Sequence, residues 1–481
     1  MFKNLFNRKK DTKVFVIGLD CAPPELIFDA WRDELPNLKR LMDSGAYGVM
    51  YSSTPAITVP AWSSMTSSKD PGILGFYGFR NRADYTYDNR YIATGLSVKE
   101  KRVWDILGEA GKRCIIVGVP QTYPVRPING YLISSFLTPS TTNPKIQWTH
   151  PPSLKEEVEQ LLAPEVYDVD VPQYRTDDKE FLLKQINDMT RKRFMVLRYL
   201  LEEKEWDFFM FVEMGVDRIH HGLWAHHDHN HHKHDPLSPY VNAIRDYYQY
   251  LDQEIGMLLE RLPPETHIIV VSDHGVKKMD GGICINEWLR REGYLVLLDD
   301  PPEGHLSSFE KVEVDWTKTT VWGDGGYYGR IFINVAGREP SGVIKAEEYE
   351  DFRNKLAENI EHIPAPDGSP LDTKVFKPQE IYRQVRNVAP DLIVYFDNMG
   401  WRSVSSFGHG DIYTFKNDTG PDDANHAVNG LYIYTPPKEK LGGLCLPDTQ
   451  LMDFAPTILD IFGLPIPADM QGKIIRTNGT R

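Results

Sequence analysis

The residues of this sequence that are best suited to chemistry are acids and imidazoles that closely follow apolar segments. Residues 268–271 are isoleucine and valine, and Asp273, His274 and Gly275 come after a single serine. Such a β-branched run predicts a short buried strand. In a parallel α/β sheet, ligands bind beyond the carboxyl ends of the strands, so Asp273 and His274 are candidate metal ligands. The alternative for this stretch is an ordinary turn with a polar cap.

Two further apolar segments end in a similar way. Residues 13–19 are followed by Asp20, and residues 207–212 lead into Asp217 and His221. Asp217 and His221 are four residues apart, so a helical turn brings both to one face, a spacing that suits metal ligands. Without a metal, Asp20 would be a helix cap, and Asp217 and His221 would be a hydrogen-bonded surface pair.

A hydroxyl has a comparable position at Thr58. Pro60 suits the first turn of a helix, because its missing N–H is not needed there. Thr58 is therefore expected just before a helix N-terminus, where backbone N–H groups and the helix dipole favour an anion. The Thr58 hydroxyl could serve as an N-cap or as a nucleophile towards phosphorus.

The composition restricts the kind of protein. The chain has 481 residues, of which 41% are hydrophobic and 25% charged, as in ordinary globular proteins. Its net charge of −14 argues against binding to nucleic-acid polymers. Its four cysteines form no CxxC pair, which argues against a thiolate zinc site. No apolar run reaches the roughly 18 residues that span a bilayer, and residues 1–12 form a basic tail without a signal-peptide core. We therefore expect a cytoplasmic protein without a transmembrane segment.

The order of apolar segments predicts an α/β fold with a central, mostly parallel sheet flanked by helices. We expect residues 13–300 and 376–481 to form the core of the fold, with the segment 391–396 as a strand of its sheet. The pattern of apolar segments changes between residues 301 and 375, which we expect to form a small α+β insertion or cap.

Two loops are candidates for the wall of a substrate site, residues 69–90 and 121–140. The first is rich in glycine and aromatic residues. Within these loops we expect Arg80, Asn81 and Tyr123 to contact the substrate. A plain surface loop is the alternative for each.

The segment His226 to His234 contains six histidines among nine residues. Such a tract could chelate a metal. No apolar scaffold surrounds it to fix a ligand geometry, so we expect a solvated loop that lies outside the metal set.

The candidate residues together make a set with a recognisable chemistry. Three carboxylates, three imidazoles and one hydroxyl are oxygen and nitrogen ligands in a number that fits two divalent ions, with zinc the first expectation and manganese the alternative. The set consists of Asp20, Thr58, Asp217, His221, Asp273, His274 and His426.

With these motifs in their order, the chain resembles the alkaline phosphatase superfamily, and within it the type I phosphodiesterase and nucleotide pyrophosphatase family. The resemblance covers residues 14–472. It rests on Ile17-Gly-Leu-Asp20, Thr58-Val-Pro-Ala-Trp62, Asp217-Arg-Ile-His-His221, Ser272-Asp-His-Gly275, His426 before Gly430-Leu-Tyr-Ile, and Asp453-Phe-Ala-Pro-Thr-Ile-Leu-Asp460.

This resemblance implies an alkaline-phosphatase-like fold and a division of the ligands between two metals. One metal would be held by Asp217, His221 and His426, for which His409 is the alternative. The other would be held by Asp20, Asp273 and His274, with Thr58 joining it as the nucleophile that forms a phosphothreonine. The implied function is a two-metal phosphodiesterase or nucleotide pyrophosphatase that acts on a small phosphate ester.

Other activities of the same superfamily remain open as alternatives. They are a phosphomutase or phosphoryl-transfer enzyme, and a phosphonate or phosphomonoester hydrolase. The text Thr58-Val-Pro-Ala-Trp62 lacks the x-Pro-Ser-Arg signature of a sulfatase. A catalytically inactive scaffold would have lost a ligand, whereas every expected ligand is present.

Overall fold

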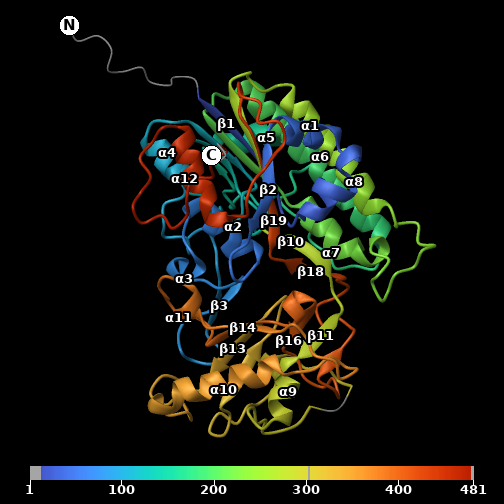
Figure 1. Cartoon of the computed structure of the whole chain (residues 1–481), viewed down its shortest axis with the longest axis vertical. Helices are drawn as coiled ribbons and strands as arrows, with labels where there is room; N and C mark the ends of the chain where they lie inside the picture. Colours follow the sequence, from blue (N-terminus) through green and yellow to red (C-terminus); the bar gives the residue numbers. More distant parts are fainter. Residues whose placement is uncertain (1–11, 302–303, 478–481) are drawn as a thin grey trace.

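The computed structural model describes residues 12–301 and 304–477, and these form a large upper lobe and a smaller lower lobe (Figure 1). The upper lobe is built on a ten-stranded sheet in the order β20-β2-β19-β9-β1-β8-β5-β6-β7, with β21 beside β2. Its strands are β1 (Lys13–Leu19), β2 (Ala46–Tyr51), β5 (Cys114–Val117), β6 (Gly130–Ile133), β7 (Thr149–His150), β8 (Phe208–Glu213), β9 (Thr266–Val271), β19 (Asn429–Thr435), β20 (Leu444–Cys445) and β21 (Thr449–Gln450).

The centre of this sheet is parallel, as the sequence predicts. β1 pairs in parallel with β8 and β9, and β5 pairs in parallel with β6 and β8. β19 is antiparallel to its neighbours β9 and β2. The predicted α/β fold with a mostly parallel central sheet is therefore confirmed.

Helices cover both faces of the sheet. Successive side chains of a central strand point to opposite faces, and those on both faces are apolar. In β1, Phe15 and Ile17 belong to one hydrophobic cluster, while Val14 and Val16 belong to the other. The first face is covered by α1 (Pro36–Ser44), α5 (Ser153–Leu162), α6 (Lys179–Glu203), α7 (Gly215–His227) and α8 (Ala243–Leu259). The second is covered by α2 (Thr58–Ser67), α4 (Val103–Glu109) and α12 (Phe454–Ile461).

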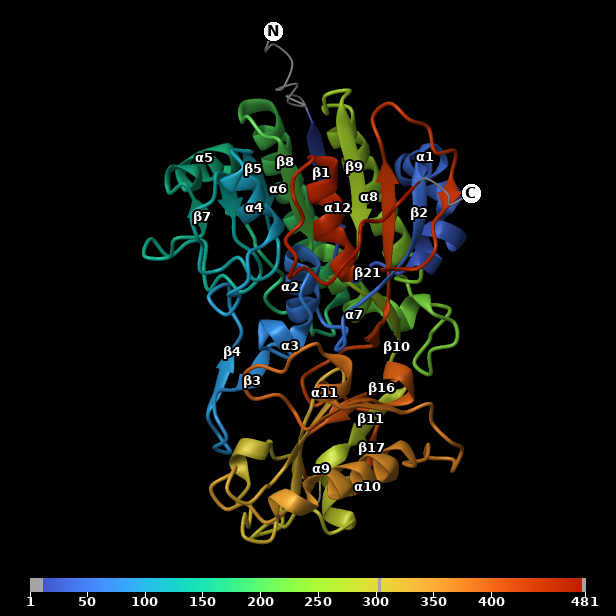
Figure 2. The same cartoon turned by 60° about the vertical axis from the view of Figure 1, so that its left-hand side comes forward.

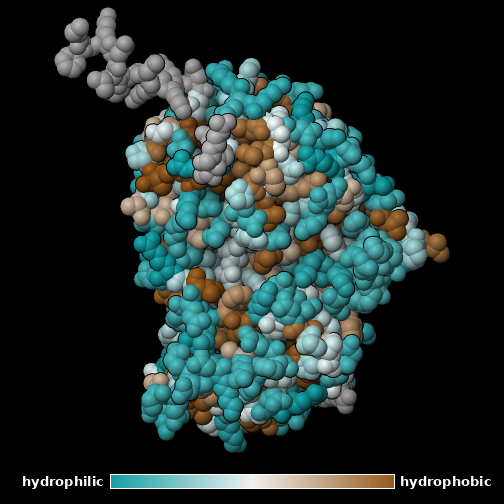
Figure 3. All heavy atoms as spheres, in the orientation of Figure 1, coloured by the Kyte–Doolittle hydropathy of each residue, from teal (hydrophilic) through white to brown (hydrophobic). Residues whose placement is uncertain are grey.

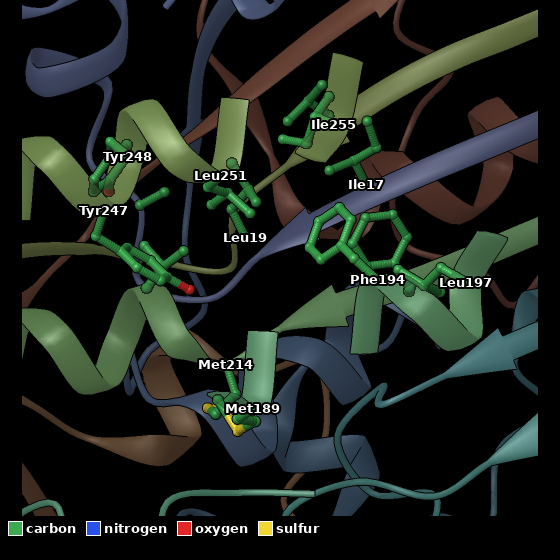
Figure 4. Close-up of a cluster of buried hydrophobic side chains, with 14 of the residues drawn as sticks. Ile17, Leu19, Met189, Phe194, Leu197, Met214, Tyr247, Tyr248, Leu251 and Ile255 are labelled. Atoms are coloured by element: carbon green, nitrogen blue, oxygen red, sulfur yellow. The ribbon is translucent and has the colours of Figure 1, made fainter. Parts of the chain in front are cut away.

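The first of these clusters is the larger core of the upper lobe. Figure 4 shows Ile17 of β1 close to Phe194 of α6 and Ile255 of α8, and all three side chains are buried. Burial of a large apolar side chain contributes about 1.5–3 kcal/mol. This packing fixes α6 and α8 against β1, whose carboxyl end leads to the candidate residue Asp20.

The lower lobe contains most of the chain from β11 to β17 (Figure 2). It has a four-stranded antiparallel sheet in the order β12-β13-β15-β14 and a three-stranded sheet in the order β16-β11-β17. Its elements are β11 (Gly281–Cys284), α9 (Ile285–Arg291), β12 (Val321–Asp324), β13 (Gly329–Ile333), α10 (Tyr349–Glu361), β14 (Lys374–Phe376), α11 (Pro378–Ile381), β15 (Leu392–Tyr395), β16 (Trp401–Val404) and β17 (Tyr413–Thr414).

The prediction that residues 391–396 return to the main sheet is wrong. They form β15, which pairs with β13 and β14 in the lower lobe. An apolar run has the same pattern in a strand of either sheet, so the sequence does not indicate to which sheet this strand belongs. The hydrophobic cluster of this lobe runs from Ile283 to Ile412, which extends beyond residues 301–375 on both sides. The division of the chain into domains at those residues stays a prediction.

Shorter elements connect the two lobes. β10 (Gly275–Lys278) follows β9 and pairs with β18 (Ala424–Ala427), which precedes β19. The short helix α3 (Pro71–Leu74) leads to the hairpin of β3 (Arg80–Arg82) and β4 (Arg90–Ile92). Figure 3 shows that the visible face is mainly hydrophilic with separate hydrophobic patches. Among the helices in the described ranges, none combines the length and apolarity needed to cross a bilayer.

Candidate active site

The predicted residues meet at the carboxyl ends of three neighbouring strands. Asp20 follows β1, Asp217 lies in the first turn of α7 after β8, and Asp273 follows β9. β18 delivers His426 by pairing it with Val276 of β10, two residues after His274. Because β9, β1 and β8 are adjacent and parallel, these ends lie at one edge of the sheet.

The ligand atoms fall into two overlapping groups. In one, atoms of Asp217, His221 and His426 lie within 4.8 Å of one another, and Sγ of Cys21 shares that group. In the other, the same holds for Asp20, Asp217 and His274. All of these side chains are buried.

The three histidines use one ring nitrogen in the same way. Nδ1 of His221 donates to Asp422 Oδ1 at 2.8 Å, that of His426 to the carbonyl of Ala56 at 3.0 Å, and that of His274 to the carbonyl of Gly275 at 3.1 Å. An acceptor oxygen at Nδ1 holds the ring proton there, so in the neutral ring Nε2 carries the lone pair. Burial lowers the pKa of His221, but Asp422 and Asp217 outweigh it and raise this pKa to about 9, so without a cation this ring also holds a proton on Nε2. The Nε2 atoms of His221 and His426 lie 3.2 Å apart, which is close enough for the two rings to share one proton or one cation.

The three aspartates show the corresponding arrangement. One oxygen of each is held by a donor, which is Trp62 Nε1 at 2.7 Å for Asp20, the Arg218 guanidinium at 2.5 Å for Asp217, and the backbone N–H of Cys21 at 3.2 Å for Asp273. The other oxygen of each is buried and has no hydrogen-bond partner among the described residues. An orphaned buried carboxylate oxygen is costly unless something unseen satisfies it.

The electrostatics of the site also calls for positive charge. Burial raises the pKa of Asp20 and Asp273 well above the usual range, and the neighbouring carboxylates add to the shift. Burial lowers the pKa of His274 to about 4, which keeps this ring neutral at pH 7. Imidazoles and carboxylates are the donors that divalent metals bind, and the metal displaces any proton that a ligand atom holds. The residues present therefore fit the metals that the sequence implies.

Thr58 lies beside the second group. Its Oγ1 is 3.4 Å from Nε2 of His274, which in turn is 3.2 Å from Asp273 Oδ2 and 3.9 Å from Asp20 Oδ1. Thr58 is the first residue of α2 rather than the residue before it, and no side chain in the described chain caps this helix. The N-cap alternative for Thr58 is therefore excluded, and its hydroxyl faces the ligand group from a helix N-terminus.

A cavity of about 690 Å³ opens from this site towards the lower lobe. Thr58, His221 and His426 line it from the upper lobe, and residues such as Tyr327 and Ser403 line it from the lower lobe. Its volume is typical of small-molecule sites, which are about 300–1,000 Å³.

Only one of the three predicted substrate contacts lines this cavity. Arg80 does, as an exposed side chain on β3. Asn81 instead accepts from the N–H of Tyr77 and donates to the carbonyl of Gly78, which closes its own loop. Tyr123 lies outside the lining and accepts through its carbonyl from Gly95. The glycine-rich segment indicates a loop near the site, but it does not identify the side chains that face the cavity.

The histidine tract is only partly the solvated loop that the sequence predicts. His229 and His232 are exposed, whereas His231 is 4% exposed and donates to the carbonyl of Asp423 at 3.1 Å. His226 and His227 belong to the last turn of α7. His409, the alternative ligand, bonds to Ser406 at 2.9 Å, and it is His426 that joins the ligand group.

Sequence reasoning missed the side chains that orient the ligands. Asp422 holds His221 and itself accepts from Tyr327 OH at 2.9 Å and from Arg175 Nε at 3.0 Å. Nothing in the sequence marks Asp422, because it belongs to a long polar loop. The signal for Trp62 was present, since it is one helical turn after Thr58, and Arg218 is adjacent to Asp217.

Fold and site together define a phosphoric ester hydrolase with an alkaline-phosphatase-like fold. More narrowly, the chain belongs to the type I phosphodiesterase / nucleotide pyrophosphatase family, whose sequence model matches residues 14–422. The family implies divalent metal cofactors. His426 lies just beyond the matched range. No curated protein sequence matches the chain.

Solved structures of the same architecture support the fold. Human ectonucleotide pyrophosphatase/phosphodiesterase 5 is similar with a TM-score of 0.55 at 13% identity, covering 95% of this chain and 96% of that chain. The murine protein of the same name gives a TM-score of 0.54 at 13% identity, with 95% and 96% coverage. An inactive threonine-to-alanine form of the murine protein in complex with AMP gives 0.53 at 12% identity, with the same coverage.

Proposed function

We propose that this protein hydrolyses small phosphodiesters and nucleotide pyrophosphates through a covalent intermediate on Thr58, with two divalent ions bound. The observation that carries the proposal is the shared orientation of six side chains. Each of the three aspartates and three histidines has one polar atom bonded to a partner outside the set. The second polar atom of each lies near other members of the set. Such fixing of ligands by outer partners is typical of metal sites.

We assign the ligands to the two ions as the resemblance implies, and we note that Asp217 belongs to both groups of neighbouring ligand atoms. When bound, the ions would lower the pKa of the Thr58 hydroxyl and neutralise charge on the phosphoryl oxygens. Zinc suits this mixture of imidazole and carboxylate, and manganese is the alternative. The residues that would hold one ion are Asp217, His221 and His426, and those that would hold the other are Asp20, Asp273, His274 and Thr58.

The reaction is a double displacement at phosphorus. In the first step the Thr58 oxygen bonds to phosphorus, the hydroxyl proton leaves to solvent, and the P–O bond to the leaving group breaks. The leaving oxygen takes up a proton as it departs. In the second step a water oxygen bonds to phosphorus, the bond to Thr58 breaks, and Thr58 regains its proton. Two in-line displacements give net retention at phosphorus. The backbone N–H groups of Thr58 and Val59 at the start of α2 favour the phosphoryl charge.

The cavity supports a small ester as the substrate. Arg80 lines it without an ion-pair partner among the described residues, so its charge is free for an anionic group. The complex of the related murine protein with AMP makes nucleotides the first compounds to test.

The covalent step can be tested directly. Metal-loaded protein is mixed with an aryl phosphodiester, quenched in acid and digested, and the peptide with Thr58 is examined by mass spectrometry. A phosphoryl adduct on Thr58 is the expected result. Turnover without any adduct, together with full activity of Thr58→Ala, would show direct attack by water instead. A panel of a diester, a monoester, a phosphonate ester and a nucleotide, with an alcohol acceptor added, separates hydrolysis from phosphoryl transfer.

A further inference from the structure

The histidine tract packs against the back of the candidate metal site through one short segment of chain. Asp422 and Asp423 are buried between α7 and the turn after β10. The N–H of Asp423 donates to the carbonyl of His221 at 3.1 Å, and its own carbonyl accepts from the N–H of Met279 at 3.1 Å. The same carbonyl accepts from Nε2 of His231 at 3.1 Å.

The bonding of His231 defines a single state of its ring. Nδ1 accepts from the backbone N–H of Lys233 at 3.1 Å, so it carries no proton, and Nε2 is therefore the donor to Asp423. The Lys233 ammonium adds an ion pair to Asp423 at 2.9 Å. His231 thus binds the backbone carbonyl of Asp423, and Lys233 binds its side chain. The rest of the tract does not take part in this contact.

Asp423 is adjacent in the chain to Asp422, the residue that orients the candidate ligand His221. Asp422 accepts from Nδ1 of His221 at 2.8 Å, which aims Nε2 of that ring at Asp217 Oδ1, 3.2 Å away. The chain reaches Asp422 from a polar loop that follows the short strand β17. Arg175 and Tyr327 bind the side chain of Asp422, and the contacts of Asp423 fix the backbone next to it. Among the described residues, His231 and Lys233 supply the side-chain hydrogen bonds to Asp423.

We propose that His231 and Lys233 act as positioning residues, which set the affinity for the ion of the Asp217–His221–His426 group through Asp423 and Asp422. The tract then serves the metal site from outside, without ligating. This inference rests on the proposed function, because it requires that group to bind a divalent ion.

The test measures zinc affinity of the full chain by competition with a chromophoric chelator, with both binding steps resolved. His231→Ala should weaken one of the two steps by up to about tenfold, the lower end of the effect of removing a direct partner of a ligand such as Asp422, and leave the other within about twofold. His231→Gln keeps an N–H donor for Asp423 and should recover most of the loss. His229→Ala is the matched control from the exposed part of the tract, and it should change neither step.

A double-mutant cycle separates positioning from general loosening of the loop. If His231 acts through Asp422, the variant that combines His231→Ala with Asp422→Asn should lose no more affinity than Asp422→Asn alone. Losses that simply add would overturn the proposal. Should His231→Ala fail to fold, Lys233→Met replaces it, since the Lys233 side chain is 43% exposed, and it should weaken the same step.

The failure of this inference and that of the proposed function give different results. Wild-type protein that binds no zinc or manganese overturns both. Wild-type protein that binds two ions, together with a His231→Ala variant that binds both equally well, overturns only the inference.

Discussion

At the scale of single residues, Thr58 makes the sharpest prediction. Its side chain caps no helix and its Oγ1 points to His274, so its loss should affect chemistry far more than folding. We expect Thr58→Ala to lower turnover by about three orders of magnitude or more, with bound metal retained and a stability change below ~1 kcal/mol. Thr58→Ser should keep part of the activity, because the hydroxyl remains. The measurements are steady-state kinetics, metal content and denaturant unfolding.

The same helix offers a matched control for that prediction. Ser63 of α2 is buried, and its hydroxyl donates to the carbonyl of Val59 at 2.8 Å, within its own helix. Ser63→Ala should therefore leave turnover nearly unchanged. An equal loss of activity in both variants would mean that any hydroxyl removed from α2 disturbs the site, and the role of Thr58 as nucleophile would not stand.

The site residues that could be predicted from the sequence are acids and imidazoles that lie just after a predicted strand. Asp20 comes directly after an apolar run and Asp273 after a run and one serine, and the i, i+4 pair Asp217 and His221 follows another, so one topological rule places them together. Asp422 follows no strand, and its role depends on how a loop folds back. Its partnership with His221 therefore became visible only in three dimensions.

At the scale of elements, α2 holds two parts of the site one turn apart. Thr58 begins it, and Trp62 donates from its indole to Asp20. In Trp62→Phe the ring still fills the space against β1 but the donor is lost. We expect affinity for the ion of the Asp20 group to fall about tenfold, as measured by chelator competition.

Trp104→Phe on α4 is the control for that variant. Trp104 lies in the same hydrophobic cluster and is fully buried, but its indole N–H has no hydrogen-bond partner in the described chain. The two substitutions remove the same atoms from the same core. Equal effects on metal affinity would attribute the Trp62 result to packing rather than to the bond with Asp20.

A helix or strand could be predicted from the sequence where its hydrophobic pattern fits only one kind of element. The apolar run at residues 268–271 has a clear end before Asp273, and it occurs as part of β9. Residues 391–396 form a strand as predicted but in the other sheet, because nothing in the run itself identifies β13 and β14 as its partners. Strand existence is a local property, whereas strand partnership is not.

At the scale of the whole molecule, the cavity lies between the two lobes. The upper lobe supplies the residues proposed for chemistry, while Tyr327, Ser403 and Arg402 of the lower lobe line the space that a substrate would occupy. Residues at this boundary come from segments far apart in the chain, such as β3 and β16. This explains why the sequence predicted the side chains that gather at the strand ends better than those that line the cavity.

The stability of the whole molecule should depend on bound metal. Without a cation, the burial of Asp20 and Asp273 among other carboxylates disfavours their charged forms. A ligand that binds only the folded state at a concentration of 100 times its Kd contributes about 2.7 kcal/mol, and we propose two such ions. Removal of metal by a chelator should lower Tm by on the order of 5–10 °C. Zinc or manganese should restore it, with metal analysis approaching two equivalents per chain.

The variant Asp273→Asn tests the electrostatic origin of that shift. Asparagine keeps the oxygen that accepts from the N–H of Cys21, but it removes one of the buried charges that repel each other. Without metal, the variant should melt no lower than the wild-type protein, because the repulsion is relieved. With zinc it should gain less than the wild type, since a ligand is lost. If the variant melts well below the wild type without metal and gains as much from zinc, Asp273 stabilises the fold by itself and does not bind the ion. Identical melting of the wild-type protein with chelator and with metal, at a metal content near zero, would remove the metals from the mechanism altogether.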